Sequence, residues 1–178
     1  MHNNLMKKPF WHSCSLMLAG ILFLSCTSLS SGSDRSRISD EPAAAEPYIL
    51  ESINRIRKEH HLPILTVSPA LQNIARDHSR YMAKSSYLGH GRGGNDFETR
   101  IEKARLKGWR EVGENVGRSM GYPNNSATII SGWMQSKHHR ENILSAGFNK
   151  TGIGTALADD GTLYATQVFM GTDESPAR

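Results

Sequence analysis

Residues 151–170 of this chain read TGIGTALADDGTLYATQVFM, and this stretch decides the fold. It contains two runs with a composition typical of strands, 151–158 and 162–170, which are joined by Asp159-Asp160-Gly161. An Asp-Gly pair between two such runs is a strong signal for a β-hairpin. We therefore expect the domain to end in two antiparallel strands.

The residues before the hairpin have helical periodicity instead. Ile49, Ile53 and Ile56 recur at helical spacing, which predicts a helix from Pro47 to about His60. Ser68-Pro69 is a typical helix start, because serine is a common N-cap and proline is tolerated at the first helical position. This pair begins a second predicted helix.

Further elements follow before the hairpin. Asp96 is expected to cap a third helix that ends before Gly108, and a strand is expected over Val112–Val116. Two more helical segments are predicted over residues 126–136 and 138–144. Helices that precede a hairpin, without regular βαβ alternation, predict an α+β domain in which helices cover an antiparallel sheet.

The N-terminal segment is typical of a signal for export. Lys7-Lys8 precedes the apolar run 14–25, which is too short to span a bilayer comfortably and ends in small residues. Residues 1–25 are therefore expected to be a signal peptide. Phe23-Leu24-Ser25-Cys26 resembles a bacterial lipobox, in which Cys26 becomes the acylated first residue of the mature chain. Simple secretion, with cleavage near Ser25, is the alternative.

Composition divides the rest of the chain. Residues 27–46 are rich in Ser, Asp, Arg, Ala and Pro, which predicts a flexible linker. Residues 47–171 form one domain of ordinary size, and residues 172–178 are expected to be a frayed tail. The only cysteines are Cys14 and Cys26, so the mature domain has no disulfide. An acylated Cys26 would hold the protein at a membrane surface without a spanning helix.

Charge does not indicate a nucleic-acid partner. Without Lys7 and Lys8, the excess of basic over acidic residues falls from four to two. One basic cluster is interleaved with glutamates, which favours a solvated helix face over a nucleic-acid surface. Its members are Arg100, Lys103, Arg105, Lys107 and Arg110.

Three short segments carry the residues best suited to chemistry. They read Gly89-His90-Gly91, Gly113-Glu114-Asn115 and Ser136-x-x-His139-Arg140-x-Asn142-Ile143. A carboxylate and two imidazoles that converge in a cleft can bind a divalent metal or move protons near neutral pH. We expect His90, Glu114 and His139 to line one solvent-reachable pocket.

The ordered set of these segments resembles the CAP superfamily, also called the SCP/TAPS family, in its compact bacterial form. The matching landmarks run through nearly the whole domain. They are Ile53-Asn54-x-x-Arg57, Leu62-Pro63-x-Leu65, 71–82, Gly89-His90, Gly113-Glu114-Asn115, Trp133-Met134, 139–144, Thr151-Gly152-Ile153-Gly154 and 164–169. The resemblance implies a three-layer α-β-α sandwich with a central, mainly antiparallel sheet.

The resemblance also implies a set of cleft residues. The family's two histidines correspond to His90 and His139, and its first acidic residue corresponds to Glu114. A second acidic residue normally follows the tryptophan matched by Trp133, but this chain has Gln135-Ser136 there. The expected cleft residues are therefore His90, Glu114, Ser136, His139 and Asn142.

A metal site is one interpretation of this set. Two imidazoles, a carboxylate and a position open to water make a plausible catalytic Zn²⁺ shell. Alternatively, His90 and His139 hydrogen-bond the backbone or Glu114 and organise loops. Glu114 itself can be a metal ligand, a partner that orients an imidazole, or a brace for the Gly-Glu-Asn turn.

Other residues favour simpler roles. His78 lies on the apolar face of the second helix and is expected to be a hydrogen-bonded core residue, and Trp133 is expected to be core. Gly117-x-Ser119-x-Gly121 fits a nucleophile elbow, but no histidine follows His139 to complete a triad.

The expected cleft residues suggest three functions. The leading hypothesis is an exported, non-enzymatic protein of the cell envelope, whose cleft binds a small lipid-like ligand, a protein partner or a metal. The second is a zinc-dependent hydrolase with Glu114 as catalytic base. The third is a structural surface adaptor that acts through exposed loops such as 121–125.

Overall fold

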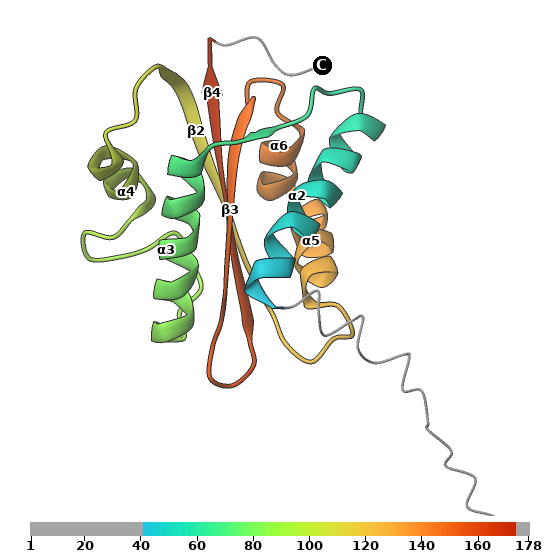
Figure 1. The fold of residues 1–178 in the computed structure, drawn as a ribbon, viewed down its shortest axis with the longest axis vertical. Coiled ribbons are helices and arrows are strands. Elements are labelled where there is room, and N and C mark those ends of the chain that lie inside the picture. Colours follow the sequence, from blue (N-terminus) through green and yellow to red (C-terminus); the bar gives the residue numbers. More distant parts are fainter. Residues whose placement is uncertain (1–40, 174–178) are drawn as a thin grey trace, which may run out of the picture.

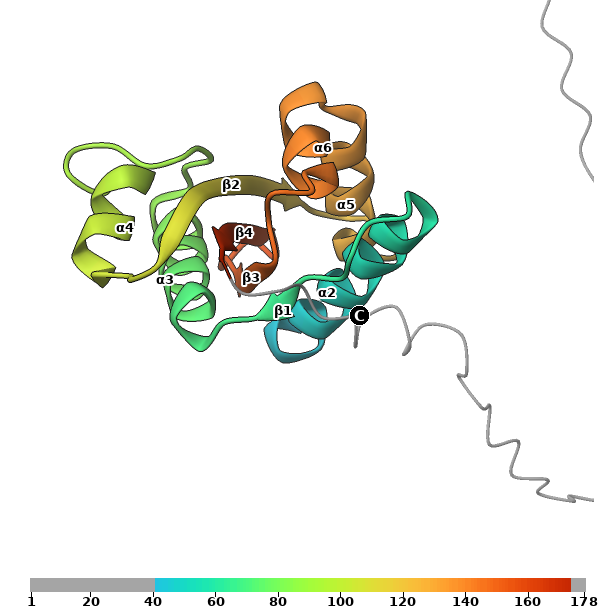
Figure 2. The same ribbon diagram turned by 90° about the horizontal axis from the view of Figure 1, so that it is seen from above.

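A computed structural model describes residues 41–173 of the chain (Figure 1). The elements in order are α2 (Pro42–Glu59), β1 (Thr66–Val67), α3 (Pro69–Ser85), α4 (Phe97–Ala104), β2 (Trp109–Ser119), α5 (Asn125–Gln135), α6 (Lys137–Leu144), β3 (Lys150–Leu157) and β4 (Leu163–Thr172). Seen from above, α3 and α4 lie on one side of the sheet, and α2, α5 and α6 lie on the other (Figure 2). The expected α+β, three-layer α-β-α sandwich is confirmed.

The sheet is built around the predicted hairpin. Its strand order is β1-β3-β4-β2, and β4 pairs antiparallel with both β3 and β2. Gly161 has φ +83°, a conformation that glycine adopts without steric cost, in the turn between β3 and β4. The two-residue strand β1, which the sequence did not predict, pairs parallel with β3. The strand β2 therefore forms one edge of the sheet.

The central strand β4 separates two hydrophobic layers. Every residue from Leu163 to Thr172 is buried, and alternate side chains point to opposite faces. Ala165 and Phe169 pack in the cluster formed with α2, α5 and α6, which also contains Trp133. Val168 and Met170 pack with the inner faces of α3 and α4. The prediction that Trp133 is a core residue is confirmed, with 2% of it exposed.

Helix α2 begins five residues before the expected start at Pro47. Pro42 occupies the first turn, and Pro47 lies inside the helix, where it removes one backbone hydrogen bond. The extra turn is held by Glu46, which is buried and bonds Gln72 Nε2 at 3.0 Å and Arg76 Nε at 2.9 Å. Residues 42–46 are therefore part of the folded domain and not of the expected linker.

Two side chains on α2 fasten this helix to distant parts of the chain. Asn54 both donates to Leu65 O at 3.0 Å and accepts from Leu65 N at 2.8 Å. Arg57 is fully buried and donates to backbone carbonyls of Pro63, Ile143, Ser145 and Phe148. These bonds fix α2 to the segment before β1 and to the connection between α6 and β3.

The remaining boundaries differ only slightly from those expected. The Asp96 side chain accepts a hydrogen bond from Thr99 N at 3.0 Å, as predicted for the cap of α4. That helix ends at Ala104, because Arg105 adopts a left-handed conformation three residues before Gly108. Thr172 closes β4 and is buried, so the expected tail begins one residue too early.

The predictions for the signal peptide, Cys26 and residues 27–40 lie outside the described residues. Within residues 41–173, no helix is long and apolar enough to cross a membrane.

Candidate functional site

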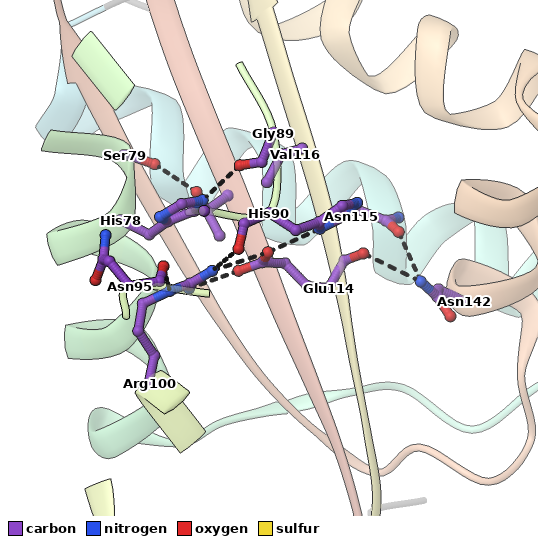
Figure 3. A network of polar contacts seen from close by, with 12 residues as sticks. His78, Ser79, Gly89, His90, Asn95, Arg100, Glu114, Asn115, Val116 and Asn142 are labelled. Carbon is purple, nitrogen blue, oxygen red and sulfur yellow. Dashed lines mark hydrogen bonds and ion pairs between the residues drawn. The ribbon is translucent and has the colours of Figure 1, made fainter. Parts of the chain in front are cut away.

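The candidate site lies along β2, at the edge of the sheet. The loop between α3 and α4 approaches this strand from one side, and α6 approaches it from the other (Figure 2). Because successive strand residues point to opposite faces, Glu114 is directed toward the loop and α4, whereas Asn115 is directed toward α6 (Figure 3). Segments 89–91, 113–115 and 139–142 are thus brought together at one edge.

Glu114 is the buried centre of the site. Its side chain is 1% exposed, and its Oε1 lies 2.9 Å from His90 Nδ1. Arg100 Nη1 donates to Oε2 at 2.7 Å, and Arg100 Nη2 donates to Oε1 at 3.1 Å (Figure 3). Both carboxylate oxygens are therefore engaged by a paired guanidinium and an imidazole.

Arg100 is a site residue that the sequence reasoning missed. It was expected on a solvated helix face, but it is only 9% exposed and lies beneath the site. A signal was available, since Phe97, Arg100, Ile101 and Ala104 lie on one face at helical spacing. Arg100 also donates to His90 O at 3.1 Å, so it holds the loop as well as the carboxylate.

The α3–α4 loop is shaped to present His90. His78 Nε2, on α3, lies 2.8 Å from Gly89 O and anchors the residue before His90. Gly91 has φ +100°, and a Cβ there would overlap the carbonyl of Asn95. A glycine is therefore required for this tight turn.

His78 is a core residue, as predicted, but only one of its ring nitrogens is paired. It is fully buried, and within the described part of the chain Nδ1 has no hydrogen-bond partner. Burial lowers the pKa of His78, and this outweighs the opposing charge of Glu114. The ring is therefore neutral near pH 7.

Electrostatics make the cluster an ion-pair network. Burial raises the pKa of Glu114. The hydrogen bonds from His90 and Arg100, together with the charge of Arg100, lower this pKa by more than burial raises it, so it lies below its ordinary value. The hydrogen bond to Glu114 raises the pKa of His90, and burial opposes this only in part. Glu114 is therefore ionised at neutral pH, and His90 is protonated more readily than a free histidine.

Helix α6 is fastened to the same strand through amide side chains. Asn142 Nδ2 donates to Asn115 Oδ1 at 2.9 Å and to Glu114 O at 3.3 Å. Asn115 Nδ2 in turn donates to His139 O at 3.0 Å. Asn142 and the backbone of His139 therefore meet β2 beside Glu114.

The His139 side chain is less closely tied to the cluster. Burial lowers the pKa of His139, and the charges of His90 and His138 lower it further, so it interacts electrostatically with His90. A cavity of about 550 Å³ between α4 and β2 is lined by His90 and Glu114, but His139 is not among its lining residues. Ser136 lies at the junction of α5 and α6, and its side chain does not cap α6. Whether His139 and Ser136 share a pocket with Glu114 stays a prediction.

The donor set does not fit a three-ligand Zn²⁺ shell. Within residues 41–173, no group of three or more His, Cys, Asp or Glu side chains could hold a metal ion. Glu114 would have to release Arg100, whose guanidinium places a positive charge against both oxygens. Glu114 contacts His90 Nδ1 through Oε1 at 2.9 Å, and its role as a partner that orients this imidazole stays a prediction. A site formed by His90 and His139 alone stays a prediction.

The link between His90 and Glu114 predicts a pH dependence of stability. A base whose pKa is raised on folding stabilises the fold at pH values below its unfolded pKa, which is 6.5 for His90. This stabilisation is lost as the pH rises through the pKa of the folded state. Relative to His90→Ala, the wild type should be more stable below pH 6.5, by about 1 kcal/mol or less because the imidazole is half exposed. The difference should shrink toward pH 9 in urea unfolding curves.

The matched control for this measurement is His138→Ala. The His138 side chain is 90% exposed on α6, so its removal should change stability little at any pH. A difference between wild type and His90→Ala that grew as the pH rose would contradict the assigned hydrogen bond.

Known proteins are similar to this chain in sequence and in fold. The model of the CAP family, described as the cysteine-rich secretory protein family, matches residues 50–169. The uncharacterized protein YkwD of Bacillus subtilis is 28% identical over 131 residues, which are 72% of this chain and 48% of that protein. This chain thus spans about half the length of that relative.

Two solved structures have the same fold at low identity. An extracellular protein containing an SCP domain from Bacillus anthracis has a TM-score of 0.62 at 24% identity, over 76% of this chain and 43% of that one. An outer surface protein from Borrelia burgdorferi has a TM-score of 0.63 at 16% identity, over 71% of this chain and 92% of that one. Because the family model covers more than half of the sequence and the sandwich matches, the chain belongs to the CAP family.

Proposed function

We propose that this chain is an exported CAP protein of the bacterial cell envelope, which acts by binding a ligand or partner at the edge of β2 and does not catalyse a reaction. The observation that carries this proposal is the bidentate pairing of Glu114 with Arg100. A general base needs a free oxygen and a pKa near the working pH, and Glu114 has neither.

The geometry is better suited to holding surface groups in place. Arg100 donates to Glu114, to His90 O and to Asn95 O, so one buried side chain holds the α3–α4 loop at two points. On the other face of β2, Asn115 and Asn142 fix α6. Such a rigid frame presents His90, which is 56% exposed at its side chain, to a binding partner.

The two alternatives are less well supported. A zinc-dependent hydrolase would need Glu114 to leave Arg100 and act on a metal-bound water held by His90 and His139. A purely structural adaptor would use exposed loops, and Tyr122, in the loop between β2 and α5, is 59% exposed. In that case His90→Ala would leave binding unchanged.

The proposed location rests on the leader sequence and on the relatives. The structural neighbours from B. anthracis and B. burgdorferi are described as extracellular and outer surface proteins. Acylation at Cys26 would attach this chain to a membrane, and simple secretion after residue 25 would release it. No nucleic-acid partner is proposed, because the basic residues on α4 alternate with glutamates.

Mass spectrometry of the natively purified protein tests the proposal. We expect a bound small molecule or protein partner that is lost in His90→Ala and retained in His138→Ala, together with less than stoichiometric metal. The same spectrum reports whether Cys26 is acylated. Zinc-dependent turnover by the pure protein that is abolished by His139→Ala would instead establish the hydrolase.

A further inference from the structure

The cavity between α4 and β2 has an apolar floor beside the ion-pair network, and the Arg100 guanidinium lies 5.6 Å from the centre of the Phe97 ring. Phe97 and Ile101 face it from α4, and Trp109 and Val112 face it from β2. We call this cavity the α4–β2 groove. Its volume of about 550 Å³ is in the range of small-molecule sites. Trp109 is 44% exposed, which is unusual for so large an apolar side chain.

Two exposed carboxylates lie at this groove. Glu98 and Glu102, one helical turn apart on α4, line it, and within residues 41–173 neither has an ion-pair partner. Among the described residues that line the groove there is no lysine or arginine. The third carboxylate, Glu114, is already neutralised by Arg100. Glu98 and Glu102 therefore place two exposed negative charges beside an apolar surface, and among the described lining residues His90 is the one base that faces them.

We propose that the α4–β2 groove binds a small amphipathic cation, an amine or quaternary ammonium that carries an alkyl or aryl group. The apolar part of the ligand would cover Trp109, Phe97 and Ile101, which removes apolar surface from water. The cationic head would lie near Glu98 and Glu102 and against the face of Trp109, where the ring quadrupole attracts a cation. Fatty acids and other anions are disfavoured, because their carboxylate would meet two like charges.

The cation would be one ligand of the proposed function, and its assignment rests on that function, but the two can fail separately. His90 also lines the groove, but its side chain is 56% exposed and can meet a partner that does not enter the groove. A groove that binds no cation would leave the His90-dependent partner of the mass spectrometry experiment unaffected.

Calorimetric titration with octyltrimethylammonium, below its micelle concentration, tests the groove. Octanoate serves as the ligand of matched length and opposite charge. We expect saturable binding of one octyltrimethylammonium per chain, and affinity for octanoate at least about tenfold weaker. Added sodium chloride should weaken binding of the cation, because exposed charges are screened.

Two variants locate the binding. Glu98→Gln/Glu102→Gln should weaken octyltrimethylammonium binding by about tenfold and reduce the preference over octanoate. The matched control, Glu51→Gln/Glu59→Gln, changes net charge equally at exposed positions of α2 and should bind like the wild type. Trp109→Ala should weaken the binding of both octyltrimethylammonium and octanoate. Any of four results would overturn the proposal. They are equal affinity for the two ligands, binding of several molecules per chain, no saturable binding, and an unchanged affinity in Glu98→Gln/Glu102→Gln.

Discussion

Arg100→Met is expected to lower the free energy of unfolding by about 3–5 kcal/mol at pH 7, because it leaves the ionised Glu114 buried without its guanidinium partner. The loss should become smaller as the pH falls below 4.5, the ordinary pKa of a glutamate. A carboxyl whose pKa is lowered on folding stabilises the fold above its ordinary pKa, and this stabilisation is lost as the pH falls through the folded pKa. Arg100→Met lacks this stabilisation at every pH, so the two proteins become more alike in acid. Urea unfolding at neutral and acidic pH measures both effects.

Lys103→Met on the same helix is the matched control. Lys103 is exposed, so its replacement should change the free energy of unfolding by no more than about 0.5 kcal/mol. Arg100→Met/Glu114→Gln should recover part of the stability, since the buried charge is then absent. A loss below about 1 kcal/mol in Arg100→Met would show that Glu114 does not depend on Arg100.

Gly154→Ala is expected to lower the free energy of unfolding by about 3 kcal/mol, because α3 lies directly against β3 at this point. A Cβ at residue 154 would overlap backbone atoms of Ala75 and Arg76, and one at Gly152 would overlap those of Leu71 and Gln72. The overlapped atoms are backbone, so relief requires the helix to move. Thermal unfolding of the variant measures the loss.

Gly132→Ala is the control substitution. Gly132 lies on the exposed face of α5, where a Cβ meets no atom within 4 Å. Alanine is favoured over glycine inside a helix, so this variant should gain about 0.5–1 kcal/mol. Equal effects of the two substitutions would contradict the close approach of α3 to β3.

Local signals predicted most of the fold. The hairpin followed from Asp159-Asp160-Gly161, and the starts of α3 and α4 followed from Ser68-Pro69 and Asp96, because turns and caps depend on a few neighbouring residues. The predicted start of α2 was wrong because long-range contacts, and not a local signal, set where this helix begins. Pro47 is a good local start signal, but the contacts of Glu46 with α3 stabilise another turn before it.

The site was predicted only in part. The proximity of His90 to Glu114 was expected from the family resemblance, and the structure places them 2.9 Å apart. The burial of Arg100 was missed because a charged residue among other charges resembles a solvated face until its partner across the fold is known. The two-residue strand β1 was missed because it depends on its long-range pairing with β3 and has too short a pattern of its own.

The protonation of Glu114 tests the central claim most directly. Carbon-13 NMR of the glutamate carboxyl carbons, assigned by Glu114→Gln, reports its pKa before and after addition of equimolar Zn²⁺. We expect a pKa below 4.5 and no change of the Glu114 signal with the metal. Titration of Glu114 near neutral pH, or a shift of its signal on addition of Zn²⁺, would contradict a site in which Arg100 and His90 occupy that carboxylate.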